Sequence, residues 1–365
     1  MRIQTLYIDQ AVADQPLCET IAARLGLTPE PVTSPEAAYR YVAAASDPVA
    51  AGKRSLLLTR NKGAFIRPCP GTSYYTCCNY MILHIGTFCV MDCAYCILQS
   101  YFHPPLLQYY VNQSDMTAAL DEVFAKGKIR RIGTGEFTDS LIWETADPIS
   151  AKLIRKFAGQ DQAILEIKSK SVQIAHLLDL PHNRKTIMAW SLNTEPVVAR
   201  EERGTASLDA RLRAASQCQD RGYPLAFHFD PLILYPGCET DYLAMLDRLF
   251  NTIDPSGIVW ISLGSFRFMP DLKPIVQARF PASKMIYGEF IKGLDGKMRY
   301  FKPQRLALYR RLVGRIQRDA PQVTAYFCME DDEAWQQAFG FTTAEKGGLP
   351  AMLDRAAVRH CGLRP

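Results

Sequence analysis

The sequence predicts an α/β protein built around an open, partial (β/α)6 barrel of the TIM type, with a small α/β extension before it and a hairpin-and-helix extension after it. From residue 79 onward, apolar segments of about six residues alternate with amphipathic segments of about ten, which is typical of parallel strands and crossover helices. Six such units are too few for the closed eight-unit barrel, so the sheet is expected to stay open. The chain of 365 residues, 48% hydrophobic and 22% charged, is long enough for the barrel and both extensions.

The expected N-terminal extension, residues 1–75, has the pattern of a small α/β layer. Ser34 followed by Pro35 and Glu36 is typical of a helix start, and the run SLLLT is an apolar strand candidate. The elements expected here are a strand at 3–8, helices at 15–25 and 34–45, and a strand at 55–59. This layer is expected to cover the barrel edge or to support substrate binding.

The barrel itself is expected over residues 76–283, where short apolar runs and helical patterns follow one another without a long interruption. Its strands are expected at 80–85, 129–132, 163–167, 186–191, 224–229 and 257–263, and its helices at 116–126, 148–158, 172–178, 208–221, 241–250 and 272–280. The C-terminal extension, residues 284–365, changes pattern. It is expected to hold a hairpin (285–291 with 298–301), a helix (303–317), a short strand (324–329) and a loose basic tail from residue 331.

Charge and composition restrict the class of protein only loosely. The net charge of +5 and the pI of about 8.6 are compatible with an anionic partner without requiring one. The chain has no run of about 18 apolar residues, so no transmembrane segment is expected, and no signal-peptide pattern precedes the first strand. An odd number of cysteines, eleven, argues against a disulfide framework. We expect a monomer in the reducing cytoplasm.

Three cysteines in one short loop are the strongest chemical signal in the chain. Cys89, Cys93 and Cys96 are spaced C-x3-C-x2-C, and thiolates at such spacing can hold three corners of one [4Fe-4S] cluster. The fourth iron then remains open to a ligand that is not a side chain. The loop follows the first barrel strand, and in α/β barrels the chemistry gathers at the carboxyl ends of the strands.

Other interpretations of these cysteines fit less well. A closed zinc site needs four ligands, usually as two spaced pairs, and no partner pair lies nearby in the sequence. A role as buried filler suits the neighbouring Asp92 and Tyr95 poorly. A second group, Cys69, Cys77 and Cys78, leaves two interpretations open: ligands of a second cluster, or packed and partly exposed thiols.

The spacing is the signature of radical S-adenosylmethionine (SAM) enzymes, and the surrounding residues resemble the spore photoproduct lyase family within that superfamily. The shared motifs are Tyr-Cys-x-Leu-Gln from Tyr95, Tyr110-Val111-Asn112, His182-Asn183-x-Lys185-Thr186, Ser191-Leu192-Asn193 and Phe266-Arg267-Phe268. The resemblance implies the barrel of radical SAM enzymes, in which a reduced cluster cleaves SAM to a 5′-deoxyadenosyl radical that abstracts hydrogen from the substrate. The family repairs a thymine dimer in spore DNA, and the resemblance implies an electron donor such as flavodoxin or ferredoxin.

The ends of strands two and three hold candidate contacts to SAM. Gly135 and Glu136 lie in Gly-Thr-Gly-Glu, which is similar to the Gly-Gly-Glu motif through which many radical SAM proteins engage the methionine amine. Glycine lets the backbone approach closely, and a carboxylate accepts hydrogen bonds from an amine. Asp139 follows at the same rim. Lys168 and Lys170 flank the end of strand three, and the resemblance favours Lys170 as the partner of the SAM carboxylate.

Three further residues complete the expected cofactor site. Ser191 and Asn193 end strand four, where hydroxyl and amide groups can bind ribose hydroxyls. Tyr95 is expected to pack beside the adenine or the cluster, and the resemblance also gives it a catalytic role in a radical relay.

Residues further along the barrel are candidate substrate contacts. His228 and Asp230 lie two residues apart, on one face of strand five, with a satisfied core histidine as the alternative for His228. Arg267, after strand six, can meet a phosphate or carboxylate.

The expected hairpin carries three cations, Lys292, Lys297 and Arg299, that can contact DNA phosphates. An ordinary solvated hairpin is the alternative, because hairpin tips favour glycine and lysine in any case.

Two positions depart from the family. The lyases carry a hydrogen-donating cysteine after strand two, where this chain has Phe137, and a second tyrosine after the third cluster cysteine, where it has Ile97. Cys328, on the last strand candidate, is a conceivable replacement donor, and a buried thiol is the alternative.

The sequence therefore favours a lyase-like radical SAM enzyme acting on a DNA or nucleotide lesion. A radical SAM enzyme with a non-DNA substrate, and a cluster-bearing sensor or nucleic-acid binder without turnover, remain as alternatives.

Overall fold

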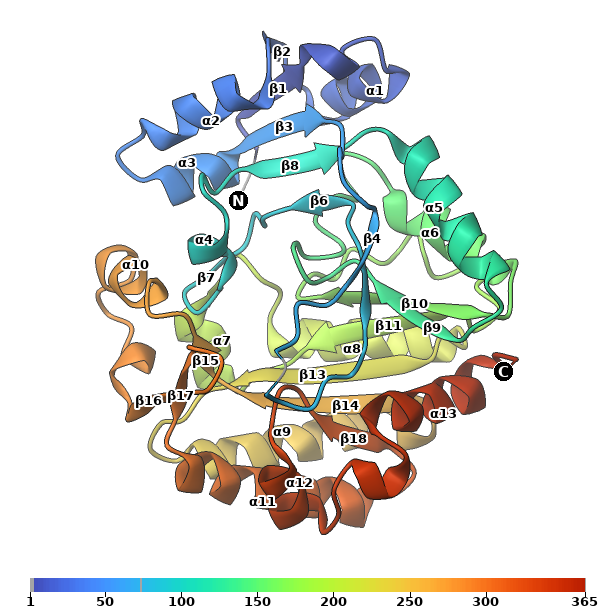
Figure 1. Ribbon diagram of the computed structural model, residues 1–365, viewed down its shortest axis with the longest axis vertical. Helices are drawn as coiled ribbons and strands as arrows, with labels where there is room; N and C mark the ends of the chain where they lie inside the picture. Colours follow the sequence, from blue (N-terminus) through green and yellow to red (C-terminus); the bar gives the residue numbers. More distant parts are fainter. Residues whose placement is uncertain (1–2, 73, 365) are drawn as a thin grey trace.

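The computed structural model describes residues 3–72 and 74–364. These residues form two large sheets, of eight and five strands, and two small ones, of three and two strands (Figure 1). The larger sheet has the order β18-β14-β13-β11-β10-β9-β5-β4 and curls into an open barrel. Its strands are β4 (Ile66–Pro68), β5 (Met81–Leu83), β9 (Arg130–Gly133), β10 (Ala163–Ser169), β11 (Thr186–Ser191), β13 (Leu225–Leu232), β14 (Ile258–Ser265) and β18 (Thr324–Phe327). All pairs are parallel except β4 with β5.

The open barrel predicted from the sequence is confirmed, and its six expected strands correspond to β5, β9, β10, β11, β13 and β14. These strands are almost wholly buried, β11 and β14 along their full length, because helices cover a parallel sheet from outside. The helices after the first strand are α5 (Gln113–Ala125), α6 (Ile149–Ala158), α7 (Glu195–Glu201), α8 (Leu208–Asp220), α9 (Cys238–Thr252) and α10 (Leu272–Arg279).

The helix predicted at 172–178 is wrong. This segment forms turns between β10 and β11, and its backbone carbonyls are taken by side chains from elsewhere. Trp190 Nε1 donates to Ser171 O (3.0 Å) and Tyr223 Oη donates to Leu177 O (2.6 Å). Of the apolar residues that suggested a helix, Ile174 and Leu177 are buried in these turns, whereas Val172 is exposed.

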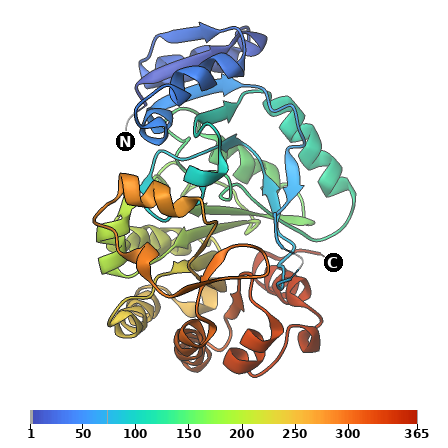
Figure 2. The same cartoon turned by 60° about the vertical axis from the view of Figure 1, so that its left-hand side comes forward.

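A five-stranded layer lies at one end of the barrel, with the strand order β2-β1-β3-β8-β6 among the described residues. Figure 2 shows this layer at the opposite end of the molecule from the C-terminal helices. Its elements are β1 (Thr5–Asp9), α1 (Pro16–Leu25), β2 (Pro29–Val32), α2 (Pro35–Ala43), α3 (Pro48–Arg54), β3 (Ser55–Thr59), β6 (Gly86–Thr87) and β8 (Leu107–Tyr110). β6 and β8 lie on the segment that connects β5 to β9. The layer is therefore continuous with the barrel at residues 88–97, the loop that carries Cys89, Cys93 and Cys96 and is called the thiol loop below.

The C-terminal part is more ordered than the sequence predicts. β18 joins the barrel sheet beside β14, and the tail expected to be loose forms α12 (Asp332–Phe339) and α13 (Leu349–Cys361), which pack on α11 (Lys302–Asp319), β14 and β18. Trp335 drives this packing: its ring is fully buried and stacks on Phe339 at 4.6 Å. No helix in the described residues is long and apolar enough to cross a membrane.

The hairpin is shorter than predicted. β16 (Phe290–Lys292) and β17 (Met298–Tyr300) pair antiparallel, and β15 (Arg267–Phe268) adds to the other side of β17. Residues Met285–Tyr287, expected in the first strand, form a 3-10 turn (η3). Figure 1 places these strands and α10 on the same side of the barrel as the thiol loop, and α5 on the far side.

Candidate active site

The three cysteines of the motif lie in one loop between β6 and α4 (Leu98–Tyr101). Cys89 and Cys93 are buried, Cys96 is half-buried, and none is in a disulfide. The loop begins at Phe88, whose φ of 69° is unusual for an aromatic residue. Its N–H donates to Phe137 O at 2.8 Å, so the turn into the loop is held against the end of β9.

Lys53, at the end of α3, holds the loop from inside. Its side chain is fully buried, and Nζ donates to Cys89 O (3.1 Å) and to Met91 O, with Asp92 Oδ1 at 3.7 Å. A buried ammonium must be paired and hydrogen-bonded to be tolerated, so the loop carbonyls and Lys53 depend on each other. Nothing in the sequence marks this lysine, which lies 36 residues before Cys89.

Arg279, at the end of α10, holds the same loop from outside. Its guanidinium binds Asp92 through two hydrogen bonds (3.1 and 3.3 Å), contacts Gln99 Oε1, and reaches Asp47 Oδ2 at 3.2 Å. The amide nitrogen of Gln99 in turn donates to Cys93 O (3.1 Å), Ala94 O (3.2 Å) and Cys96 O (3.4 Å). The loop backbone is thus clamped on both sides while its thiols remain free.

This donor set fits three corners of an iron–sulfur cube. Burial raises the pKa of Cys89 to about 12 and that of Cys93 above its usual value, and nearby Cys96 adds to both shifts; a metal must therefore displace these protons when it binds. Among residues 3–72 and 74–364, no three His, Cys, Asp or Glu side chains come together to hold a single metal ion. A cube binds each cysteine at a separate iron, so its ligands need not converge on one ion.

The residues after β9 are packed tightly against the end of β10. A Cβ on Gly135 would lie 2.8 Å from Lys168 O, so only glycine allows this approach. Asp139 accepts hydrogen bonds from Ser169 Oγ (2.7 Å), Lys170 N (2.8 Å) and Leu141 N (3.0 Å). The carboxylate of Asp139 therefore holds the segment after β9 against the end of β10.

The carboxylate of Glu136 is half-exposed and lies 3.5 Å from Lys168 Nζ, which turns Lys168 toward that carboxylate. Lys170 instead lies with Nζ 5.6 Å from the ring centroid of Tyr95, beside the thiol loop. Of the two lysines that the sequence left as candidates, Lys170 is the one next to the thiols.

Tyr95 is buried in a chain of hydrogen bonds that the sequence does not reveal. Its hydroxyl donates to Glu202 Oε1, and Arg211 Nη2 binds Glu202 Oε2 at 2.5 Å. Glu202 belongs to β12 (Glu202–Arg203), which pairs antiparallel with β7 (Asp92–Cys93). This two-residue ribbon anchors the thiol loop to the segment after β11.

Several predicted binding residues already have protein partners. Asn193 binds Pro231 O (2.8 Å) and Tyr242 Oη (2.7 Å). The two ring nitrogens of His228 lie 2.7 Å from Ser262 Oγ and 2.6 Å from Glu166 Oε1, the pattern of a satisfied core histidine. The Ser191 hydroxyl makes no hydrogen bond to the described residues.

Three of the predicted residues meet on the opposite wall of the barrel mouth. Arg267 donates to both carboxylate oxygens of Asp230 (3.3 and 3.1 Å) and lies 3.3 Å from Cys328 Sγ. Burial raises the pKa of Cys328 to about 12, and Arg267 opposes that rise. Glu136 and Lys168 also influence this pKa, so the group faces the ends of β9 and β10.

Phe137, which stands where the family's lyases have the hydrogen-donating cysteine, is part of an aromatic wall. Phe137 stacks on Tyr101 (5.9 Å) and packs on His84 (5.1 Å) and Phe102 (6.3 Å). Burial lowers the pKa of His84 to about 4, so the wall is uncharged near neutral pH.

The three cations of the hairpin differ in whether they are paired with a carboxylate. Arg299 is 3% exposed and pairs with Asp295 at 2.7 Å, and Lys297 lies 3.7 Å from the same carboxylate. Lys292 is exposed on β16. The structure therefore ties Lys297 and Arg299 into the hairpin and leaves Lys292 toward solvent.

The open barrel together with a free triple-thiol loop at its mouth defines the architecture of radical SAM proteins. The family model described as spore photoproduct lyase matches residues 72–322, and the chain belongs to this family.

Individual relatives agree with that assignment. The chain is 30% identical over 207 residues to a spore photoproduct lyase of Geobacillus sp. (strain Y412MC61) and 28% identical over 211 residues to that of Bacillus subtilis (strain 168); each match covers 55% of this chain and 60% of the relative. A solved cysteine-to-alanine mutant of spore photoproduct lyase with dinucleoside spore photoproduct superimposes with a TM-score of 0.80 at 22% identity, over 90% of this chain and 100% of that one. A double mutant with bound AdoMet gives 0.77, also at 22% identity, over 89% and 99%.

We predict that Arg279→Met weakens cluster retention by about ten- to one-hundred-fold, because residues that orient metal ligands have effects of this size. The measurement is iron and sulfide bound per chain during chelator titration of anaerobically reconstituted protein. Arg248→Met is the matched control, since Arg248 also pairs with two carboxylates, Glu195 and Asp209, away from the loop. Equal retention by both variants would contradict the clamp.

A second prediction concerns Cys77, whose exposed sulfur accepts hydrogen bonds from the Cys78 thiol and from Asn79 N (3.4 Å). The first of these does most to lower the pKa of Cys77, to about 6. Because the thiolate is the reactive form, alkylation of Cys77 should rise to half its maximum near that pH and level off above it. Peptide mass spectrometry across pH measures this rate, and Cys78→Ala should move the midpoint upward. A wild-type midpoint near the ordinary thiol value would refute the assignment.

Proposed function

We propose that this protein is a radical SAM lyase that repairs a thymine-dimer lesion of the spore photoproduct type in DNA. The observation that carries the proposal is the triple-thiol loop, held by Lys53 and Arg279 at the mouth of the family's open barrel. Family membership supports the choice of lesion, as does the dinucleoside spore photoproduct bound in the solved structure.

Cys89, Cys93 and Cys96 would hold the [4Fe-4S] cluster. When bound, the reduced cluster supplies the electron that splits SAM into methionine and a 5′-deoxyadenosyl radical. Side chains of this protein bind and orient SAM. Lys170, already beside the thiol loop, pairs with the SAM carboxylate.

Glu136 and the backbone at Gly135 accept from the SAM amine. The free hydroxyl of Ser191 is placed for a ribose hydroxyl, whereas Asn193 and Asp139 act by holding the rim in place, because their polar atoms are engaged by protein groups. Tyr95 packs beside the adenine.

Substrate binding is assigned to the opposite wall. Asp230 and Arg267 offer a carboxylate and a guanidinium at the mouth, where a flipped lesion presents carbonyl, imide and phosphate groups. Lys292 contacts a phosphate, and Lys297 and Arg299 stiffen the hairpin that carries it. His228 is assigned a structural role, because both of its ring nitrogens are engaged by Ser262 and Glu166.

Cys328 is proposed as the hydrogen donor that stands in for the residue replaced by Phe137. Its raised pKa keeps an S–H bond near neutral pH. One S–H bond breaks and one C–H bond forms on the product radical, leaving a thiyl radical on Cys328. Cys69 and Cys78 lie close enough for Cys328 to raise the pKa of both thiols, and they are candidate hydrogen sources for that radical.

The protein is further proposed to act as a cytoplasmic monomer, reduced by a flavodoxin or ferredoxin. The eleven cysteines are unpaired, which suits a reducing compartment.

The function is tested by incubating reduced, reconstituted protein with SAM and dinucleoside spore photoproduct. Repaired dithymidine should appear together with 5′-deoxyadenosine, and their ratio shows whether SAM is consumed or recycled. Deoxyadenosine without repaired product would refute the proposed substrate and favour radical chemistry on a different one. Failure of SAM to perturb the EPR signal of the reduced cluster would point to a binding protein without turnover.

In the same assay, Cys328→Ala should lower the ratio of repaired dithymidine to deoxyadenosine by about ten-fold or more, since radical formation is intact and only quenching is lost. Cys238→Ala, a half-buried thiol at the start of α9, is the control. An unchanged ratio in Cys328→Ala would move the donor role to another residue.

A further inference from the structure

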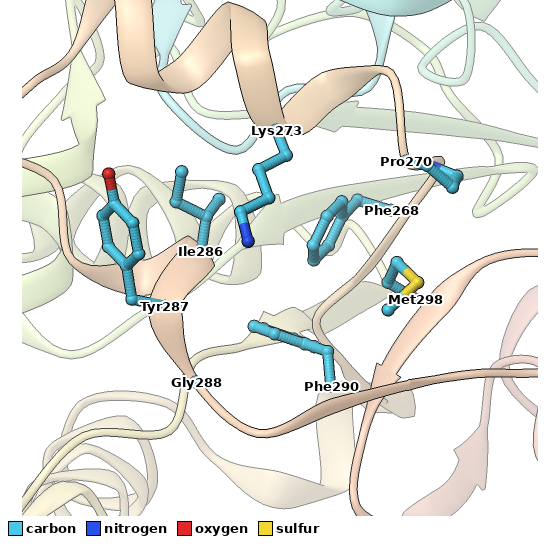
Figure 3. Close-up of a pocket in the computed structure, with 8 residues that line it drawn as sticks. All are labelled: Phe268, Pro270, Lys273, Ile286, Tyr287, Gly288, Phe290 and Met298. Atoms are coloured by element: carbon cyan, nitrogen blue, oxygen red, sulfur yellow. The ribbon is translucent and has the colours of Figure 1, made fainter.

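A groove of about 340 Å³ lies outside the barrel mouth, between α10, the η3 turn and the hairpin (Figure 3). Its walls are aromatic and aliphatic: Phe268, Tyr287 and Phe290 with Ile286 and Met298. The close-up shows the ammonium of Lys273 pointing between these side chains. The volume is at the lower end for small-ligand sites and suits one planar ring system.

The aromatic walls are held rigidly. Phe290 packs edge-on against Phe268 (5.0 Å, 82°) and stacks on Tyr300 (4.5 Å, 24°). Gln277 Nε2 donates to Tyr287 Oη at 3.3 Å, yet Tyr287 remains 54% exposed. A partly exposed ring that is hydrogen-bonded at its hydroxyl is the kind of side chain on which single-stranded nucleic acids stack their bases.

Positive charge gathers at the same place. Lys273 and Lys284 each place Nζ 5.9 Å from the Tyr287 ring centroid. Neither lysine has a carboxylate within 4.0 Å among residues 3–72 and 74–364. Residues 267–302 contain eight Lys or Arg. Five of them pair with carboxylates, namely Arg267, Arg279, Lys297, Arg299 and Lys302, which leaves Lys273, Lys284 and Lys292 without a carboxylate partner among the described residues. An aromatic platform with unpaired cations complements a base and its phosphate.

The groove is connected to the proposed reaction chamber through β15. Arg267 turns into the chamber, toward Asp230 and Cys328, whereas the next residue, Phe268, lines the groove. Successive residues of a strand face opposite ways, so this strand is a thin partition between the two sites. A strand of DNA whose lesion enters the chamber would pass its neighbouring nucleotide over the groove.

We propose that the groove binds an unstacked nucleobase next to the lesion, with the base on Tyr287 and its phosphate on Lys273 and Lys284. This rests on the proposed function, because it takes the substrate to be a DNA strand. The site would grip the strand beside the lesion and keep the flipped bases from restacking.

The test uses the full chain and an undamaged single-stranded oligonucleotide of about ten nucleotides containing 2-aminopurine, whose fluorescence reports stacking. Tyr287→Leu should weaken binding about five- to one-hundred-fold and abolish the fluorescence change. Tyr41→Leu, another exposed tyrosine, on α2, should bind as wild type. Equal binding by Tyr287→Leu and wild type would overturn the proposal.

The lysines are tested through salt dependence. Lys273→Gln and Lys284→Gln should each reduce the slope of log affinity against log salt by about one, while Lys126→Gln, at the end of α5, should leave it unchanged. Unaltered slopes in both groove variants would also overturn the proposal. The assay needs neither SAM nor turnover, so its failure is distinct from failure of the dinucleoside to be repaired.

Discussion

The active site depends on one constraint: the backbone of the thiol loop is gripped from both sides by cations outside the barrel. Lys53 binds the loop carbonyls from the N-terminal layer, and Arg279 binds Asp92 and Gln99 from α10. Each cation is poorly hydrated where it lies and is tolerated only because the loop satisfies it. The N-terminal layer and the barrel helix α10 are therefore both parts of the site, since each supplies one side of the clamp.

The same clamp fixes the backbone of the thiol loop through protein contacts. Carbonyls of the loop are taken by Lys53 and Gln99, and its edge pairs with β12. A loop preorganised in this way presents its ligands without a large entropic cost on binding. Beside this loop lie an uncharged wall around Phe137 and a charged wall around Arg267. The first wall suits apolar parts of a substrate, and the second suits its polar groups.

The two edges of the large sheet, β4 and β18, approach each other through a few contacts. The described residues between β4 and β5 approach the chain just after β18: Thr76 N donates to Glu330 O (3.0 Å), and the Tyr75 ring lies under the Arg299 guanidinium at 3.9 Å. Cys69, Cys77 and Cys78 lie on this segment, near Cys328. Thiols that are distant in the chain are thus gathered where the two ends of the sheet approach each other, which is the structural basis for giving Cys328 a chemical role.

The sequence alone determined the features that depend on local pattern. Apolar runs between helical segments predicted the six parallel strands, and the thiol spacing predicted that three cysteines share one loop, because both patterns lie within a few residues. Only the tertiary structure decided the features that depend on long-range contacts. Lys53 is buried and binds the thiol loop, and the polar atoms of Asn193 and His228 are hydrogen-bonded to protein groups. Turns replace the helix expected at 172–178. Arg267 contacts Cys328, which lies 61 residues further along the chain. The physical reason is that a side chain's role is set by the partner that burial brings to it, and no local propensity encodes that partner.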